Sequence, residues 1–262
     1  MTAQDLVQDL GGVVITGAAR GIGLAIAQTL AKAGYGVVIA DIDEAAGRKA
    51  AQDIDGRALF ARSDVSDRAS VAAAIKACEG AFGFLHGIVN NAGFNRPQPF
   101  LETTEDNWTR IMTVNGLGVM IGIQEAAKAM IAAGHKGKIV STASMAGRTG
   151  FPDFAPYCAS KAAVISLTQA AARALAPHGI CVNAFGPGVV ETDLWTQLDK
   201  DLMAMGASSA PGEAMKNFAA GIPLGRVSQP RDIAGTVAFL ISPASDYMTG
   251  QCLMIDGGMT LQ

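Results

Sequence analysis

Short apolar runs alternate with longer helical patterns along almost the whole chain. The apolar runs are rich in β-branched residues and do not alternate with polar residues, which is typical of strands covered on both faces. We expect strands at 13–16, 36–40, 58–61, 85–89, 138–140, 180–184 and 252–255. Helical patterns lie between them, at 21–33, 44–53, 67–82, 109–133 and 155–176. This succession predicts the α/β class, with a doubly wound parallel sheet and helices on both faces.

One segment, 186–224, breaks this regular succession with clustered Met, Gly, Ser and Pro residues. It is too long for an ordinary connection, so we expect a substrate lid or a pair of short mobile helices. Pro230 then suits the first turn of another helix, with Asp232 near its positive end. No linker or repeat divides the chain, so residues 1–262 are expected to form one domain.

Composition narrows the class of protein. Hydrophobic residues make up 50% of the 262 residues, charged residues make up 16%, and the net charge is −3. These values exclude a disordered chain and give no electrostatic reason to expect nucleic acid. Apolar runs such as 116–123 are shorter than the roughly 18–20 residues of a membrane span, and the amino terminus lacks the pattern of a signal peptide. We therefore expect a soluble cytoplasmic protein without a membrane partner.

The cysteines and histidines are scattered through the sequence and show no metal-ligand spacing. We therefore expect buried, reduced thiols and no metal site. The four cysteines are Cys78, Cys158, Cys181 and Cys252. The 31 glycines fit a fold with many tight strand-to-helix turns.

A glycine-rich segment follows the first predicted strand and opens a helix. Gly17, Gly21 and Gly23 lie where the chain must turn sharply and where a pyrophosphate can approach the helix amino terminus. Asp41 ends the second predicted strand, where a carboxylate can accept hydrogen bonds from both ribose hydroxyls of an adenosine. Taken alone, the segment could also be a plain glycine-rich helix start, and Asp41 makes that alternative weaker. Together these residues predict a Rossmann fold that binds a dinucleotide.

Two further motifs follow the fourth and fifth predicted strands. Asn90-Asn91-Ala92-Gly93 ends the fourth strand, either in the ligand crevice of the sheet or as a simple turn. Tyr157 and Lys161 share one helix face, and Ser144 lies shortly upstream. A nearby ammonium lowers the pKa of a phenol towards the range of a useful general acid or base. In isolation, the tyrosine–lysine pair is more often an exposed Lys beside a half-buried Tyr.

In their order and spacing, these motifs resemble the short-chain dehydrogenase/reductase family over about residues 12–258. The resemblance implies hydride transfer between a secondary alcohol and a nicotinamide dinucleotide. It implies that Ser144 binds the substrate oxygen, Tyr157 moves its proton, Lys161 binds the nicotinamide ribose, and Asn115 supports a proton relay. The cofactor-binding residues that it implies are Gly17, Arg20, Gly21, Ile22, Gly23, Asp41, Ile42, Asp64, Val65, Asn91, Ala92, Gly93, Tyr157, Lys161, Pro187, Gly188, Val190 and Thr192.

Family resemblance also implies a homotetramer. The helical patterns at 109–133 and 155–176 are too apolar all round for faces in free solvent, which agrees with subunit contacts there. The carboxyl-terminal segment 248–262 is expected to add a further interface.

Within the family, 187–195 and 242–251 resemble 2,3-butanediol dehydrogenases (acetoin reductases) and polyol dehydrogenases of the sorbitol type. A small diol, polyol or sugar alcohol is the implied substrate, although Met145 stands where many of those enzymes carry Gln. The expected substrate site consists of Ser144, Met145, Phe151, Tyr157 and Trp195. Two alternatives stay open: a reductase of a bulkier ketone, such as a 3-oxoacyl thioester or a cyclic ketone, and a non-catalytic dinucleotide sensor.

The choice between NAD(H) and NADP(H) depends on two residues with opposite effects. Arg20 can attract a 2′-phosphate, whereas Asp41 favours the 2′-hydroxyl and repels a phosphate. Ile42 follows Asp41, where NADP-dependent relatives often place Arg. We therefore expect NAD.

Overall fold

The computed structural model describes residues 10–54 and 56–261. Seven strands form one parallel sheet in the order β3-β2-β1-β4-β5-β6-β7. They are β1 (Gly12–Thr16), β2 (Gly36–Asp41), β3 (Ala58–Arg62), β4 (Leu85–Asn90), β5 (Gly137–Thr142), β6 (Ile180–Pro187) and β7 (Cys252–Ile255). Each expected strand is present, and the doubly wound parallel sheet is confirmed.

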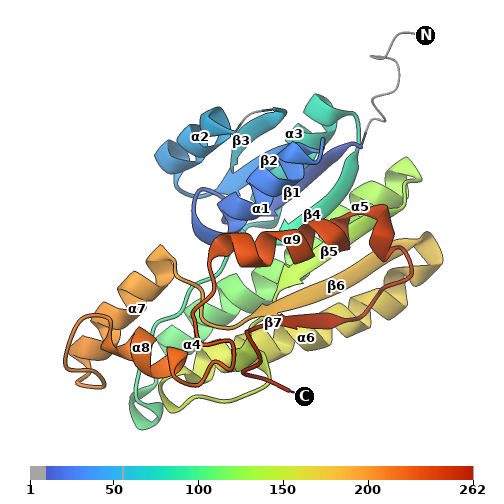
Figure 1. Cartoon of the computed structure of the whole chain (residues 1–262). Coiled ribbons are helices and arrows are strands. Elements are labelled where there is room, and N and C mark those ends of the chain that lie inside the picture. The colour runs from blue at the N-terminus through green and yellow to red at the C-terminus, as the bar shows by residue number, and fades with distance from the viewer. Residues whose placement is uncertain (1–9, 55, 262) are drawn as a thin grey trace.

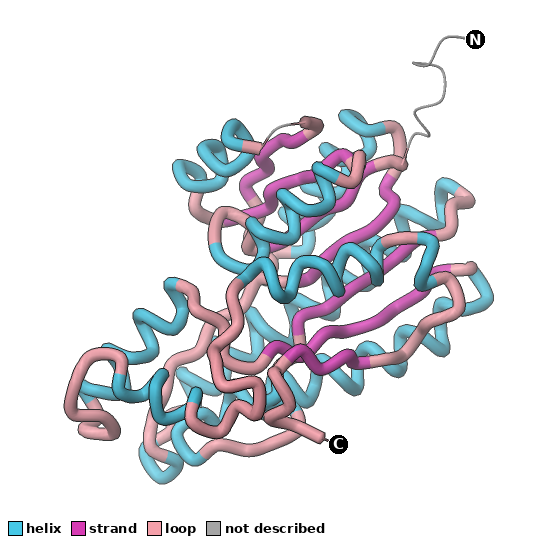
Figure 2. The backbone as a smooth tube through the Cα atoms, in the orientation of Figure 1, coloured by secondary structure: helices cyan, strands magenta, loops and turns pink. Residues whose placement is uncertain are grey.

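Helices cover both faces of this sheet (Figures 1 and 2). Their bounds are α1 (Gly21–Lys32), α2 (Glu44–Asp53), α3 (Arg68–Phe82), α4 (Glu105–Met112), α5 (Gly118–Ala133), α6 (Ala155–Leu175), α7 (Asp193–Ala204), α8 (Glu213–Ala219) and α9 (Pro230–Ile241). Residues of α1, α2 and α9 share one buried cluster with the strands, and residues of α3, α5 and α6 share the other. The sheet is therefore covered on both faces, as its uninterrupted apolar strands require.

The chain reverses its direction across the sheet between β1 and β4. Strands β1 to β3 are laid down towards one edge, and β4 to β7 towards the other. In sheets of this kind, ligands bind beyond the carboxyl ends of the strands at such a switch point. The glycine-rich loop after β1 and the Asn91 segment after β4 both lie at this point.

The segment 186–224 differs from a single long loop. Gly186 and Pro187 complete β6 by pairing with Met254 and Ile255 of β7. The remainder contains α7 and α8, which lie at one corner of the molecule (orange in Figure 1). Two short helices were one of the two expected forms, although the expected boundary at 186 is too early.

The first long apolar helix also begins earlier than its pattern predicted. Thr104 caps α4, and its hydroxyl accepts a hydrogen bond from the Asn107 backbone N–H at 3.2 Å. The helix continues through a π-turn, Thr113–Leu117, into α5. Among residues 10–54 and 56–261, Glu105–Ala133 is one helix with the length and mean hydropathy (1.2) of a membrane span, and half of its apolar window is buried in the domain. Core helices of folded domains have the same properties, so this is weak evidence for a span.

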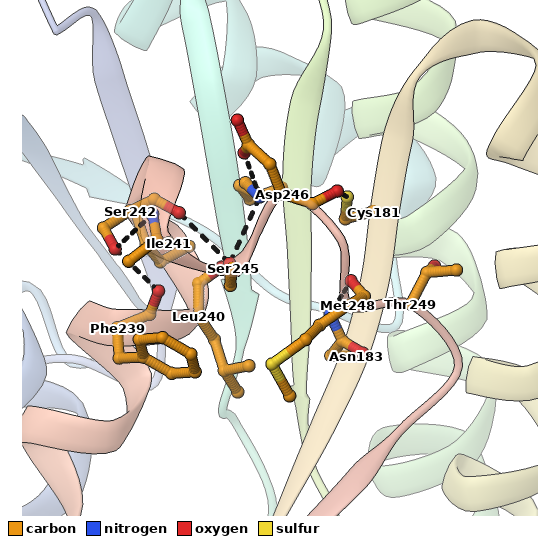
Figure 3. A network of polar contacts seen from close by, with 12 residues as sticks. Cys181, Asn183, Phe239, Leu240, Ile241, Ser242, Ser245, Asp246, Met248 and Thr249 are labelled. Atoms are coloured by element: carbon orange, nitrogen blue, oxygen red, sulfur yellow. Dashed lines mark hydrogen bonds and ion pairs between the residues drawn. The ribbon is translucent and has the colours of Figure 1, made fainter.

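Polar contacts hold the carboxyl-terminal part of the chain against the sheet (Figure 3). Asn183 of β6 donates from Nδ2 to the Met248 carbonyl at 2.8 Å, and Ser245 donates to the Leu240 carbonyl at 2.9 Å. The buried Lys138 of β5 donates to Ser245 Oγ at 3.1 Å and pairs with an Asp246 carboxylate oxygen at 2.7 Å. These contacts fix the start of β7 at the sheet edge.

The cysteines are all free, but only part of the expectation about them is met. Cys78 and Cys158 are buried, whereas Cys181 and Cys252 are half-buried. The two half-buried thiols lie in β6 and β7, near the edge of the sheet where covering is incomplete.

Candidate active site

The loop between β1 and α1 has the backbone form that its glycines predicted. Gly17 and Gly21 have φ values of +62° and +57°, which side-chain-bearing residues rarely adopt. A Cβ on Gly23 would lie 2.4 Å from the Gly17 carbonyl oxygen. Asn91 holds the loop from β4, because its Nδ2 donates to the carbonyls of Thr16 and Gly17, both at 3.1 Å.

The amino terminus of α1 is suited to an anionic group. Its N-cap residue, Arg20, makes no side-chain cap, and the first turn contains no acidic residue. By contrast, α2, α3 and α4 are capped by Asp43, Asp67 and Thr104. The free N–H groups and the positive end of the helix dipole therefore fit a pyrophosphate.

Asp41 lies beside this loop at the end of β2. Its two carboxylate oxygens accept hydrogen bonds from the backbone N–H groups of Ala19 and Asp43, each at 3.0 Å. Arg20 forms an ion pair with Asp43, so its guanidinium is already engaged by an acid. Ile42 points into solvent and is 65% exposed.

A cavity of about 380 Å³ runs from this loop across the carboxyl ends of the central strands. Most of the predicted cofactor-binding residues line it: Gly17, Arg20, Gly21, Ile22, Asn91, Gly93, Tyr157, Lys161, Pro187, Gly188, Val190 and Thr192. The other predicted cofactor-binding residues are not among those that line it: Gly23, Asp41, Ile42, Asp64, Val65 and Ala92. A glycine-bordered cavity beside an uncapped helix end fits an elongated dinucleotide.

Asp64 and Val65 serve the local fold in this structure. The Asp64 carboxylate accepts hydrogen bonds from the backbone N–H and the hydroxyl of Ser66, at 2.9 and 2.6 Å. These bonds lower the pKa of that carboxyl group. Val65 is 9% exposed and lies against Gly118, where a Cβ would approach its side chain to 2.9 Å.

Ser144, Tyr157 and Lys161 come together at the other end of the cavity. Lys161 is 4% exposed, and its Nζ donates to the Thr142 carbonyl at 2.7 Å. The same Nζ lies 5.6 Å from the centre of the Tyr157 ring. Ser144 Oγ accepts a hydrogen bond from the Ala146 backbone N–H at 3.1 Å, which fixes the hydroxyl next to the end of β5.

The pKa of the Tyr157 phenol differs in direction from the sequence-based expectation. Burial raises it above 10.0, and the hydrogen bond with the Ser144 side chain opposes this only in part. Lys161 was expected to lower the phenol pKa, but in this structure it is directed to Thr142. Burial also lowers the pKa of the Lys161 ammonium to about 8. The phenol is therefore in its acid form near neutral pH, and Lys161 is close to its titration point.

Asn115 lies in the π-turn between α4 and α5 and is fully buried. Its Oδ1 accepts a hydrogen bond from the Phe94 N–H at 3.1 Å, and its Nδ2 donates to the Phe94 carbonyl at 2.9 Å and to Ser160 Oγ at 3.2 Å. It therefore joins the segment after β4 to α6, the helix that carries Tyr157 and Lys161.

A second, smaller cavity of about 70 Å³ adjoins the first at Ser144 and Tyr157. All five predicted substrate residues line it, namely Ser144, Met145, Phe151, Tyr157 and Trp195. Phe154 lies there too. Sequence reasoning missed Asn95, Leu194, Leu198 and Phe218. Leu194 lies within the segment 187–195 that carries the family resemblance, so it could have been included. Asn95, Leu198 and Phe218 lie after β4 and in α7 and α8, outside the motifs, and no signal in the sequence pointed to them.

A cavity suited to a dinucleotide thus meets a small apolar pocket at Ser144 and Tyr157, and Lys161 lines the larger of the two. This geometry defines an oxidoreductase of the Rossmann class. Comparison with known proteins agrees. The family profile described as "Enoyl-(Acyl carrier protein) reductase" matches residues 17–260. The chain belongs to the short-chain dehydrogenase/reductase family, and it is an oxidoreductase that acts on CH–OH groups with a nicotinamide dinucleotide.

Individual relatives cover almost the whole chain. It is 41% identical to L-2,3-butanediol dehydrogenase of Corynebacterium glutamicum, over 94% of this chain and 97% of that one. It is 43% identical to galactitol 2-dehydrogenase of Agrobacterium fabrum, over 94% and 95% of the two chains. A crystal structure of a short-chain type dehydrogenase/reductase from Mycobacterium marinum superposes with a TM-score of 0.86 at 36% identity and covers 100% of both chains.

Proposed function

We propose that the protein is an NAD(H)-dependent dehydrogenase that interconverts a small diol, polyol or sugar alcohol and its ketone. The main support for this proposal is that Ser144 and Tyr157 line both cavities. The apolar pocket of about 70 Å³ suits a small substrate better than a bulky acyl thioester. The names of the relatives, which include butanediol and galactitol dehydrogenases, support the same substrate class.

In the proposed mechanism, Ser144 donates its hydroxyl hydrogen to the substrate oxygen and holds it beside Tyr157. Tyr157 takes the hydroxyl proton when the alcohol is oxidised and returns it when the ketone is reduced. When bound, the dinucleotide supplies a nicotinamide ring that accepts the hydride from the alcohol carbon. Lys161, which lines the larger cavity, would bind the nicotinamide ribose, and Asn115 would keep the segment after β4 in register with α6.

Further residues would hold the dinucleotide. Gly17, Gly21 and the first N–H groups of α1 would bind the pyrophosphate, and Asp41 the adenosine ribose. Asp64 and Val65 would lie beside adenine, and Val190 and Thr192 would bind the nicotinamide carboxamide. The engagement of Arg20 by Asp43 supports the choice of NAD over NADP.

We further propose a cytoplasmic homotetramer. An apolar groove between α4, the π-turn and α6 supports subunit contact there; its lining includes the partly exposed Trp108 and Leu117. The carboxyl-terminal segment 248–262 is the second proposed interface, and its last residue lies outside the described part of the chain.

A substrate panel tests the proposed function. The purified protein is incubated with NAD⁺ and the stereoisomers of 2,3-butanediol, sorbitol, galactitol and cyclohexanol, and with NADH and acetoin, diacetyl and a 3-oxoacyl thioester. We expect turnover of at least one small diol or polyol, detected by nicotinamide absorbance. Turnover of only the thioester or the cyclic substrate would contradict the proposed substrate class. Dinucleotide binding without turnover of any compound would favour the non-catalytic sensor.

A further inference from the structure

One residue on the wall of the small cavity, Asn95, has a side-chain oxygen without a hydrogen-bond partner. The side-chain oxygen of Asn95, Oδ1, is buried and receives no hydrogen bond. The other side chains on the cavity wall that can form hydrogen bonds are Ser144, Tyr157 and Trp195, whose indole N–H can only donate. The rest of the lining is apolar or glycine: Met145, Ala146, Phe151, Phe154, Gly188, Val189, Leu194, Leu198 and Phe218. A buried acceptor without a donor is costly, so its position in a ligand pocket requires an explanation.

The backbone around Asn95 is held on both sides. Asn115 forms two hydrogen bonds with the backbone of Phe94, at 3.1 and 2.9 Å. Asn107, which is 1% exposed, donates from Nδ2 to the Arg96 carbonyl at 3.0 Å. Asn95 therefore lies in an irregular segment whose position is fixed by two buried side chains from α4 and the π-turn. The backbone on both sides of Asn95 is thus fixed at the wall of the pocket, and a fixed backbone is the support that a ligand-recognising side chain needs.

The chemistry of this atom specifies what it can bind. An amide oxygen accepts a hydrogen bond, so its partner in the pocket must carry an N–H or O–H donor. Under the proposed function, on which this inference rests, Ser144 and Tyr157 already bind the reacting oxygen. Met145, beside Ser144, cannot donate to a second one. We propose that Asn95 binds a second hydroxyl group of the substrate and thereby selects diols and polyols over simple secondary alcohols.

The test compares two substrates that differ by one hydroxyl group, 2,3-butanediol and 2-butanol, with each stereoisomer assayed separately. In the unaltered enzyme, kcat/KM for the best diol isomer should exceed that for 2-butanol by at least about tenfold, because 2-butanol leaves Asn95 unpaired. Asn95→Leu has a similar volume and no acceptor. It should lower kcat/KM for the diol by about tenfold and leave 2-butanol unchanged or improved.

A rescue variant and two controls complete the design. Met145→Gln in the Asn95→Leu background places an amide elsewhere on the same wall and should restore part of the preference for the diol. Gln52→Leu removes a side-chain amide at an exposed position of α2, outside the cavities and outside the segment with α7 and α8, and should leave the preference unchanged. Asn95→Ala is the second variant if Asn95→Leu does not fold, as judged by thermal melting and by dinucleotide binding.

Each outcome decides the inference. A diol preference that falls in the Asn95 variants and returns with Met145→Gln supports it. Equal loss of both activities, or an unchanged preference, overturns it and leaves the proposed function intact. A comparable kcat/KM for the two substrates in the unaltered enzyme overturns it without any variant. Failure of the unaltered enzyme to oxidise any alcohol in the panel overturns the proposed function, and this inference with it.

Discussion

Replacing Asp41 by Ser and Ile42 by Arg should shift the cofactor preference from NAD⁺ towards NADP⁺. Asp41 lies beside the glycine-rich loop and accepts a hydrogen bond from Ala19 at 3.0 Å. A ribose hydroxyl at this carboxylate gains a charge-assisted hydrogen bond worth about 1.5–3 kcal/mol. A 2′-phosphate loses that bond and adds repulsion of a few kcal/mol at an effective dielectric constant near ~20. These two effects favour NAD⁺.

Arg20 is the opposing charge, and the structure reduces its influence. Its guanidinium pairs with Asp43, and the pair is exposed to solvent, so Arg20 contributes at most about 1 kcal/mol to phosphate binding. The balance predicts a preference for NAD⁺ of roughly a hundredfold or more in kcat/KM. Asp43→Asn keeps the cap oxygen of α2 but removes the charge that engages Arg20. This variant should raise kcat/KM for NADP⁺ severalfold without changing that for NAD⁺.

The assay is the initial rate with each dinucleotide at a fixed alcohol concentration, for the unaltered enzyme, Asp43→Asn and the Asp41→Ser/Ile42→Arg variant. Glu44→Gln is the matched control, because it removes a neighbouring exposed charge that pairs with Arg48 instead. Comparable kcat/KM values for NAD⁺ and NADP⁺ in the unaltered enzyme would refute the reasoning. An unchanged value for NADP⁺ in Asp43→Asn would refute the part assigned to Arg20.

Three further predictions concern the site and the assembly. Tyr157→Phe should reduce kcat to below a few per cent while dinucleotide affinity, measured by fluorescence titration, stays nearly unchanged, because only the proton-transfer group is lost. Burial raises the pKa of the Tyr157 phenol, so the phenolate that accepts the alcohol proton increases with pH through the neutral and mildly alkaline range. The kcat/KM for alcohol oxidation should therefore rise over this range, and a flat pH profile would contradict the assignment of Tyr157. Light scattering at micromolar concentration should give a tetramer, and Leu117→Glu, in the apolar groove, should dissociate it into smaller species; a monomeric unaltered protein would disprove the interface.

The fold could be predicted because the sheet depends on short-range signals. Uninterrupted apolar runs marked the strands, and the glycine-rich turn and Asp41 marked the ends of β1 and β2. Most of the candidate site followed for the same reason, since its residues lie at strand ends or one helical turn apart. Ser144, Tyr157 and Lys161 line one cavity, in agreement with their spacing in the sequence.

The features that sequence reasoning missed depend on long-range packing. Asn95 belongs to no motif, and only the contacts from Asn107 and Asn115 fix its segment at the pocket wall. The direction of the Tyr157 pKa could not be predicted either, because a spacing along a helix indicates that Lys161 is near but not that Thr142 engages its ammonium. The position of Asn95 and the orientation of Lys161 both depend on contacts with residues elsewhere in the sequence.

The segment with α7 and α8 is expected to act as a lid, and its packing provides a direct assay. Its two ends are joined by a bridge between Val190 and Ser228. Between them, Leu198, Leu202, Ala214 and Phe218 form a small apolar cluster with residues near the pocket. Trp195 contributes to this cluster, with its ring 5.4 Å from that of Phe218. A cluster of this size gives limited local stability, so the segment should open far more readily than the sheet.

Trp195 can report this motion, because the protein contains only one other tryptophan, Trp108, which lines the apolar groove between α4 and α6 and is not part of this cluster. In a Trp108→Phe/Tyr157→Phe protein, no turnover is expected to consume the dinucleotide during the measurement. Adding NAD⁺ and then a diol should change the Trp195 emission saturably and reduce cleavage of 191–227 by trypsin, because ligand favours the closed segment. Emission and cleavage rates that stay the same with both ligands at saturation would show that this segment is a fixed wall of the pocket.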